Sequence, residues 1–143
     1  MHTRIYNGKE QIFCEWRRKW VRLTPEEWVR QHFLHYLAEE MHYPKNLIAV
    51  EEMIHYISQD GAKTAKRADA VVYLNDLTPW MVIEFKADTV PLTQKVWDQA
   101  AIYNTQLHVP YLVLHNGYHT YIGKQTNSIF LLTDRMPEYG ERG

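Results

Sequence analysis

Apolar positions recur along the chain with two different spacings, and these spacings predict two helices and several short strands. Apolar side chains three and four residues apart predict helices over 24–41 and 93–107. Short apolar or alternating runs predict strands over 46–58, 67–74, 80–87, 111–115, 118–123 and 129–132. A hairpin is predicted over 3–14, because Asn7-Gly8 is a strong two-residue turn signal.

The first helix has a clear start signal. Thr24 can accept hydrogen bonds as the N-cap, Pro25 suits the first helical position, and Glu27 completes a capping box. Tyr43-Pro44 ends this helix, and Val109-Pro110 ends the second one. The polar tail from Thr133 onward is predicted to be loose.

The order of these elements predicts the fold class. Short turns between the strands at 46–58, 67–74 and 80–87 favour antiparallel pairing. The strand at 111–115 follows a helix, so it favours a crossover and one parallel pair. We therefore predict an α/β protein, a single domain over 1–143, with one mixed sheet flanked by helices and hairpins at both ends.

Composition narrows the possible functions. The 143 residues carry a net charge of −1, so nucleic-acid binding would need a local basic patch. Segment 15–23 mixes four basic residues with two tryptophans, which can hold phosphates and bases; a solvated connector with its tryptophans folded onto the core is the favoured interpretation. A single cysteine, Cys14, fits a reducing compartment and cannot form a thiolate zinc site. With no membrane-length apolar run and no signal peptide, we expect a cytoplasmic protein.

Candidate chemistry begins with the strand Trp80–Ala87. Alternation places Glu84 and Lys86 on one face and Ile83 and Phe85 on the other, which faces the core. A carboxylate and an ammonium among apolar residues need partners that satisfy both charges, and a divalent cation and a phosphate would do so. Taken alone, the pair is better explained as an ion pair on a solvated face of the sheet, and only further residues favour a metal site.

Asp69 lies on the preceding predicted strand and can sit beside Glu84 across the ladder. Two neighbouring carboxylates suit Mg²⁺, with Mn²⁺ as a possible substitute. The Phe85 carbonyl could be a third ligand. Lys86 would position the attacking water or neutralise developing charge. Gln99 and Tyr103 are spaced to share one helix face and would support the site.

These residues resemble a known motif. Asp69 followed by Glu84-Phe85-Lys86, in the order αβββαβ, is similar to the PD-(D/E)XK nuclease superfamily, and the sequence from Gln99 to Tyr103 resembles the Q-x-x-x-Y motif of its RecB-like branch. A closer resemblance is to the N-terminal nuclease domain of type I restriction enzyme R subunits. It is carried by the stretches 20–28, 66–69, 84–87, 91–94 and 110–113. The resemblance implies a restriction-endonuclease-like fold and a Mg²⁺-dependent endonuclease that hydrolyses DNA phosphodiester bonds.

The chain departs from this pattern in two ways. Ala68 replaces the proline that names the superfamily. The sequence also has no G-x-x-x-x-G-K-[ST] loop for an ATP-driven motor, so we expect a small relative or one domain of a larger protein. A nuclease fold that binds DNA or a restriction-system subunit without cutting is the alternative, and a homodimer with two sites is a third possibility.

Several charged residues keep two interpretations. Glu27 could reach the site from the first helix or serve only the capping box. Glu51 could add a ligand or be an exposed strand carboxylate. Three basic residues precede Asp69 and could either bind phosphates beside it or line a solvated turn: Lys63, Lys66 and Arg67.

Overall fold

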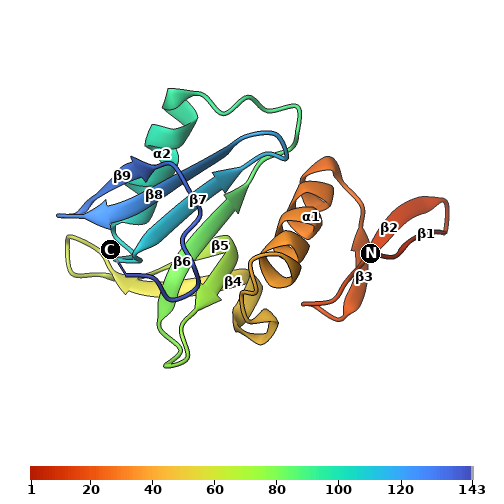
Figure 1. Ribbon diagram of the computed structural model, residues 1–143, viewed down its shortest axis with the longest axis horizontal. Helices are drawn as coiled ribbons and strands as arrows, with labels where there is room; N and C mark the ends of the chain where they lie inside the picture. Colours follow the sequence, from red (N-terminus) through yellow and green to blue (C-terminus); the bar gives the residue numbers. More distant parts are fainter. Residues whose placement is uncertain (143) are drawn as a thin grey trace.

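The computed structural model describes residues 1–142, apart from the side chain of Tyr103. Its elements form a three-stranded sheet of order β1-β2-β3 and a six-stranded sheet of order β4-β5-β6-β7-β8-β9 (Figure 1). The small sheet consists of β1 (Thr3–Tyr6), β2 (Lys9–Cys14) and β3 (Lys19–Arg22). The large sheet and its helices are β4 (Ile48–Ile57), β5 (Lys63–Tyr73), β6 (Pro79–Phe85), β7 (Tyr111–His115), β8 (Thr120–Thr126), β9 (Ile129–Thr133), α1 (Pro25–Glu39) and α2 (Gln94–Thr105). A short 3₁₀ turn, Lys45–Leu47, precedes β4.

The six-stranded sheet is mixed, as predicted. Strands β4, β5 and β6 pair antiparallel, and so do β7, β8 and β9. The central pair, β6 and β7, is parallel and is joined by the crossover through α2. The predicted α/β class, with a restriction-endonuclease-like order of helix, three strands, helix and strand, is confirmed.

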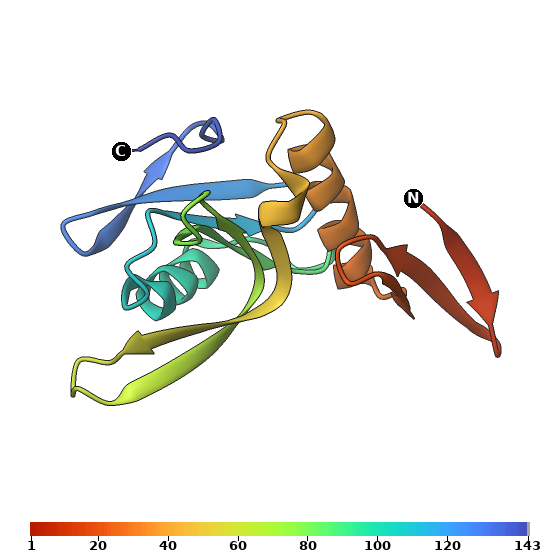
Figure 2. The ribbon, with the colours of Figure 1, turned by 90° about the horizontal axis from the view of Figure 1, so that it is seen from below.

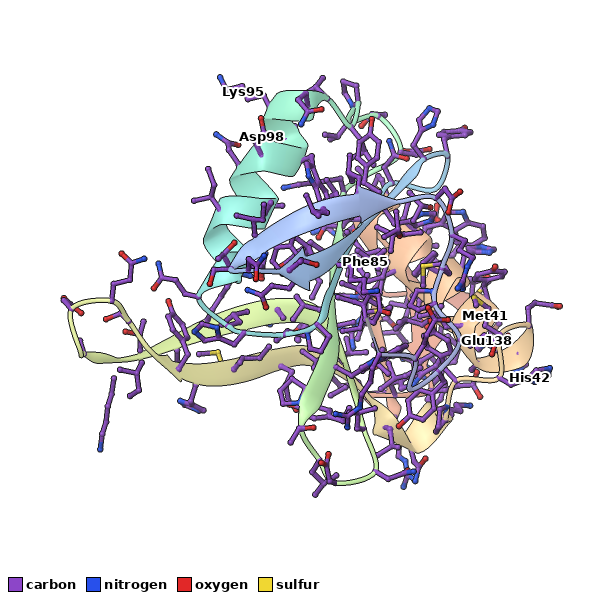
Figure 3. All side chains as sticks on the ribbon, turned by 60° about the vertical axis from the view of Figure 1, so that its left-hand side comes forward. Met41, His42, Phe85, Lys95, Asp98 and Glu138 are labelled. Carbon is purple, nitrogen blue, oxygen red and sulfur yellow. The ribbon has the colours of Figure 1, made fainter. Side chains whose placement is uncertain are left out.

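Helices α1 and α2 cover opposite faces of this sheet (Figure 2). Successive residues of β6 and β7 therefore enter two different cores: Ile83 packs with Phe33 of α1, whereas Val82 packs with Trp97 of α2. Burial on both faces explains why these central strands are almost continuously apolar. Phe85 lies in the dense centre of the molecule, while Lys95 and Asp98 project outward from α2 (Figure 3).

The start of α1 follows the predicted signal. The Thr24 hydroxyl accepts a hydrogen bond from the Glu27 N–H at 3.0 Å, and Pro25 is the first helical residue. The helix ends at Glu39, two residues before the predicted end, and Glu40 is its C-cap. The second helix also begins at a threonine N-cap, since the Thr93 hydroxyl accepts from the Val96 N–H.

The prediction of a connector over 15–23 was wrong, because residues Lys19–Arg22 form β3. Their backbone pairs with the free edge of β2, and Trp20 packs edge-on against Phe13 with ring centroids 5.5 Å apart. Only Trp16 folds toward the core, where its Nε1–H donates to the Lys45 carbonyl at 3.2 Å. The first part of the chain is thus a three-stranded sheet rather than a hairpin and a linker.

The polar tail is also more ordered than predicted. The Tyr43 hydroxyl donates to the Pro137 carbonyl at 2.6 Å, and the Trp80 indole N–H donates to the Glu141 carbonyl at 3.0 Å. Met136 and Tyr139 pack against the α1-side core. Two apolar side chains and these hydrogen bonds together hold an otherwise polar segment to the sheet. Within residues 1–142, neither helix is long and apolar enough to cross a membrane.

We predict that Gly123→Ala destabilises the α2 side of the sheet. A Cβ at this position of β8 would lie 2.6 Å from the Trp97 ring and 3.1 Å from the Phe130 Cβ, and Trp97 is only 4% exposed. Overpacking of this kind costs about 1–3 kcal/mol of unfolding free energy, measured by urea denaturation. In a Trp97→Leu background the same change should cost clearly less, because the ring that it strikes is gone. Equal costs in both backgrounds would contradict this packing.

Candidate functional site

The antiparallel ladder between β5 and β6 ends where two carboxylates meet. Its last pair toward this end is Ala70 with Ile83, and the next residues on the two strands are Asp69 and Glu84. Instead of a ladder hydrogen bond, the Phe85 N–H donates to Asp69 Oδ2 at 2.7 Å. The structure therefore places Asp69 beside Glu84 at an opening between two central strands.

Glu84 carries the strongest electrostatic perturbation of this pair. Its side chain is 17% exposed. Burial first, and then the nearby Asp69 carboxylate, raise the pKa of Glu84 to about 7. The ammonium of Lys66 lies 2.5 Å from Glu84 Oε1 and acts in the opposite direction. A second positive charge at these oxygens would stabilise both carboxylates in their ionised forms.

The cation that contacts Glu84 is thus Lys66 of β5 and not Lys86. Strand β6 ends at Phe85, and the Lys86 N–H donates to the His115 carbonyl at 3.0 Å. The exposed Lys86 side chain still lines the same cleft as Glu84. Strand alternation correctly predicts a lysine near Glu84, but the ion pair is formed by a different one.

Lys66 lies in β5 rather than in a turn, and an irregularity in β4 and β5 accounts for its orientation. Glu51 has a φ of +53° and leaves the β4–β5 ladder between the pairs Val50–Ala70 and Glu52–Ala68. Along β5, both Ala68 and Val71 pack on the α2 side, although strict alternation would separate them. The change of phase at this point allows Lys66 to point toward the α2 side and Glu84.

The two carboxylates open into a cleft of about 340 Å³ between the sheet and α2. Gln99 of α2 lines this cleft, as predicted from its sequence position. The Tyr103 side chain lies outside the described residues, so its supporting role stays a prediction. The full lining consists of Lys66, Asp69, Glu84, Phe85, Lys86, Val90, Val96, Gln99, Ala100, Asn104 and Leu114.

Asn104 is a cleft residue that the sequence analysis missed. It is 2% exposed, and its Nδ2–H donates to the Ala100 carbonyl at 2.8 Å. Its Oδ1 has no hydrogen-bond partner among the described residues. A buried amide oxygen of this kind could accept from a bound water or ligand. The only sequence signal was its position on the helix, five residues after Gln99.

Helix α1 contributes Glu26 rather than Glu27 to the surroundings of the site. Burial raises the pKa of Glu26, the Asp69 carboxylate raises it further, and Arg30 and Lys86 lower it. Glu26 therefore lies within electrostatic reach of two predicted site residues. The capping-box pattern in the sequence indicates Glu27, and no pattern indicates Glu26.

Glu27 instead forms the centre of a buried charge cluster. Its carboxylate accepts from Arg17 at 2.6 Å, Arg30 at 2.5 Å and Gln31 at 2.9 Å. The predicted capping box is therefore only half formed, with the Glu27 N–H but not its carboxylate at the cap. Burial opposes ionisation, but these donors outweigh it and lower the pKa of Glu27 to about 2.

Glu51 joins the same cluster from β4. Its Oε1 contacts Arg17 at 3.3 Å and Arg30 at 3.2 Å, and its Oε2 pairs with Arg67. These contacts give Glu51 and Arg67 structural partners, and their roles as a metal ligand and a phosphate contact stay predictions. The cluster ties the small sheet, α1, β4 and β5 together behind Asp69.

The donor set fits a hard divalent cation better than a softer metal. Among residues 1–142, no group of three or more acidic, histidine or cysteine side chains is placed to hold an ion. Mg²⁺ is typically bound by one or two carboxylates and keeps several waters. Two adjacent carboxylates with one backbone carbonyl nearby match that mode.

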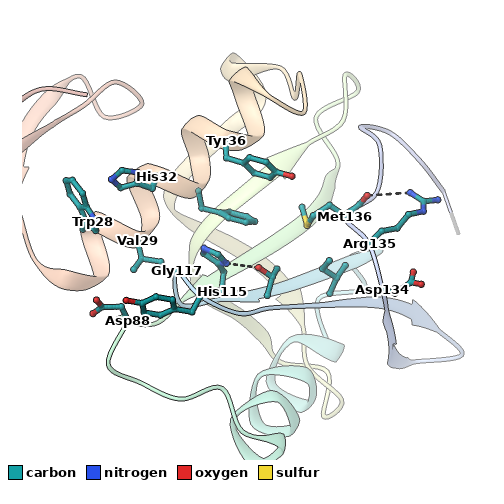
Figure 4. Close-up of a pocket in the computed structure, with 14 residues that line it drawn as sticks. Trp28, Val29, His32, Tyr36, Asp88, His115, Gly117, Asp134, Arg135 and Met136 are labelled. Atoms are coloured by element: carbon teal, nitrogen blue, oxygen red, sulfur yellow. Dashed lines mark hydrogen bonds between the residues drawn. The ribbon is translucent and has the colours of Figure 1, made fainter.

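A larger cavity, about 670 Å³, lies on the α1 side of the sheet (Figure 4). It is lined by aromatic residues of α1, including Trp28 and Tyr36, and by His115 at the end of β7. Burial lowers the pKa of His115 to about 4, so this imidazole is neutral at pH 7. The cavity holds neither Asp69 nor Glu84, and size alone therefore does not identify the candidate site.

Comparison with protein families gives a match to the type I restriction enzyme R protein N terminus (HSDR_N) over residues 25–137. The chain belongs to this family. The match includes Asp69, Glu84, Lys86 and Gln99 and begins immediately after the small sheet. No curated protein matches the chain. Family membership supports a role related to restriction enzymes.

We predict that Glu27→Gln destabilises the HSDR_N fold at neutral pH by about 3 kcal/mol, because the buried Arg30 and the half-buried Arg17 lose the nearer of their two carboxylate partners. The folded-state pKa of Glu27, about 2, lies below its usual value of 4.5. Its contribution is therefore complete above pH 4.5 and is lost as the pH falls toward 2. Urea denaturation between pH 2 and 7 should show a shallower acid dependence in the variant.

The matched control is Glu39→Gln, which removes the same charge from the end of α1. The Glu39 side chain is 69% exposed, so its replacement should change the unfolding free energy by less than about 0.5 kcal/mol. Equal losses in the two variants would show that the cluster contributes nothing specific.

Proposed function

We propose that this HSDR_N domain is a metal-dependent endonuclease that hydrolyses DNA phosphodiester bonds. The observation that carries the proposal is the convergence of Asp69 and Glu84 where β5 and β6 separate, in a cleft that Lys86 and Gln99 also line. Family membership also supports the nuclease proposal, since the matched family is the N terminus of a restriction enzyme protein.

In this proposal Asp69 and Glu84 would hold Mg²⁺, or Mn²⁺, and the Phe85 carbonyl would be a third ligand. The ion would lower the pKa of a bound water and offset negative charge on the phosphate. Lys86, exposed at the cleft, orients the attacking water or neutralises charge on the scissile phosphate. Gln99 positions the phosphate or Lys86 from α2, and Tyr103 contacts the DNA backbone.

Lys66 has a different role in this scheme. Its ammonium offsets the charge of Glu84 in the cleft. Because a divalent cation and an ammonium would share that carboxylate, Lys66 sets how strongly the site attracts metal. It is a positioning residue for Glu84, whereas Lys86 acts on the substrate.

A second candidate function is a module that binds DNA or another restriction-system subunit without cutting. The 2.5 Å contact between Lys66 and Glu84 favours it, because an ammonium already offsets the carboxylate charge. Titration calorimetry with Mn²⁺ separates the two candidates. Saturable binding that Asp69→Asn weakens supports the nuclease, while no binding, or binding unchanged in Asp69→Asn, supports the module.

We predict that Asp69→Asn and Lys86→Met each slow cleavage of supercoiled plasmid DNA in Mg²⁺ by about 100-fold or more. The two variants should differ in metal binding: Asp69→Asn weakens Mn²⁺ binding, whereas Lys86→Met retains it. Lys95→Met, on the outer side of α2, is the control and should cut like the wild type. If Lys86→Met cuts as fast as the wild type, the assigned mechanism is wrong.

We also predict that Lys66→Met binds Mn²⁺ about tenfold more tightly than the wild type, because Glu84 loses a competing positive charge. Lys63→Met removes the same charge at an exposed position of the same strand and should leave the affinity unchanged. Calorimetry of the three proteins measures this difference. Weaker binding in Lys66→Met would place the ion away from Glu84.

A further inference from the structure

The small sheet of β1, β2 and β3 lies outside the family match, which begins at residue 25. It projects past α1, away from the six-stranded sheet (Figures 1 and 2). Residues 1–23 contain six of the 16 Lys and Arg residues but two of the 17 acidic residues, a net charge of +4 in a chain of net charge −1. The family assignment does not account for this concentration of positive charge.

Strand register divides the small sheet into two different faces. The pairs Ile12–Val21 and Cys14–Lys19 define an inner face, where Ile12 and Cys14 are completely buried. The pairs Arg4–Gln11, Tyr6–Lys9, Gln11–Arg22 and Phe13–Trp20 define the opposite face. We call this the outer face; its members within the three described strands are Arg4, Tyr6, Lys9, Gln11, Phe13, Trp20 and Arg22, and none of them is acidic.

Aromatic and basic side chains are in direct contact on the outer face. The Arg4 guanidinium lies 4.2 Å from the Trp20 ring centroid and 4.8 Å from that of Tyr6, and its Nε–H donates to Gln11 Oε1 at 2.8 Å. Phe13 packs edge-on against Trp20. Arg4 is therefore held flat against the face while most of its donors remain available.

The turn between β2 and β3, together with the buried Ile12 and Cys14, attaches the small sheet to the rest of the molecule. Arg17, which follows β2, joins the Glu27 cluster, and Trp16 donates to the Lys45 carbonyl. On the outer face, Tyr6 is 54% exposed, and Arg4, Lys9 and Arg22 are exposed as well. A surface with three exposed cations, the exposed Tyr6 ring and the half-buried Phe13 and Trp20 rings thus faces solvent.

We propose that the outer face binds single-stranded DNA. Arg4, Lys9 and Arg22 would contact phosphates, which accounts for the absence of carboxylates from this described surface. Tyr6 and Phe13 would stack on bases, which only unpaired nucleotides offer in full, and this favours a single strand over a duplex. The choice of DNA as the nucleic acid rests on the proposed nuclease function.

The test is fluorescence anisotropy of a labelled oligothymidine mixed with the full chain in EDTA, where metal-dependent cleavage cannot occur. We expect saturable binding that weakens steeply with salt and is stronger than binding to a duplex of equal length. Lys9→Gln and Arg22→Gln should each weaken binding several-fold and reduce its salt dependence. Tyr6→Ala should weaken binding about fivefold or more, from the loss of one stacked base.

The matched control is Lys19→Gln, which removes the same charge from the inner face of the same sheet and should bind like the wild type. Lys9 and Tyr6 are exposed on the β1–β2 hairpin, and thermal melts will show whether their variants fold normally. Outer-face variants that bind like the wild type would overturn the proposal. Equal binding of duplex and single strand, with no effect of Tyr6→Ala, would also overturn it.

This experiment is independent of cleavage. Binding that depends on the outer face, in a protein that never cuts DNA, would retain this surface and reject the nuclease. Cleavage that depends on Asp69, without outer-face binding, would support the nuclease and reject the outer face as a DNA-binding surface. An oligouridine of equal length shows whether the surface distinguishes DNA from RNA, and stronger binding to the RNA would contradict the choice of DNA.

Discussion

Two carboxylates close together at the end of a buried strand are the constraint on which the rest of the structure depends. Glu84 lies where β6 emerges from between two cores, beside Asp69 and against Lys66. Like charges at such a site favour protonation unless positive charge offsets them. The strands, both helices and the surrounding ion pairs hold these charged side chains together at a cleft that is open to solvent on the α2 side.

The two cores and the Arg–Glu cluster supply that support from different directions. Helix α2 forms one wall of the cleft, while α1 packs on the opposite face and carries Glu26, whose pKa is raised by burial and by the Asp69 carboxylate. Behind Asp69, Glu27 and Glu51 are bound by three arginines from separate elements. The small sheet is part of the same framework through Arg17.

Much of the fold and part of the site follow from local sequence. The helix starts, the antiparallel strands and the parallel pair came from capping residues, alternation and turn lengths, which are local properties. The neighbouring positions of Asp69 and Glu84 followed from hairpin pairing, and the place of Gln99 in the cleft from helix spacing. The third strand of the small sheet was missed, because pairing with the edge of β2 leaves only a weak signal in a short basic segment.

The sequence by itself determined both helices, the strands of the six-stranded sheet and their order, and the positions of Asp69, Glu84 and Gln99, because these depend on period, turn type and residue identity. The tertiary structure decided which charges meet. Lys66 rather than Lys86 contacts Glu84, because an irregularity opposite Glu51 changes the phase of β5. Glu26 rather than Glu27 is within electrostatic reach of Asp69 and Lys86. Glu27 is bound instead by Arg30, one turn along the same helix, and by Arg17 and Gln31. Long-range contacts of charged side chains leave no periodic trace in the sequence, so only the folded chain reveals them.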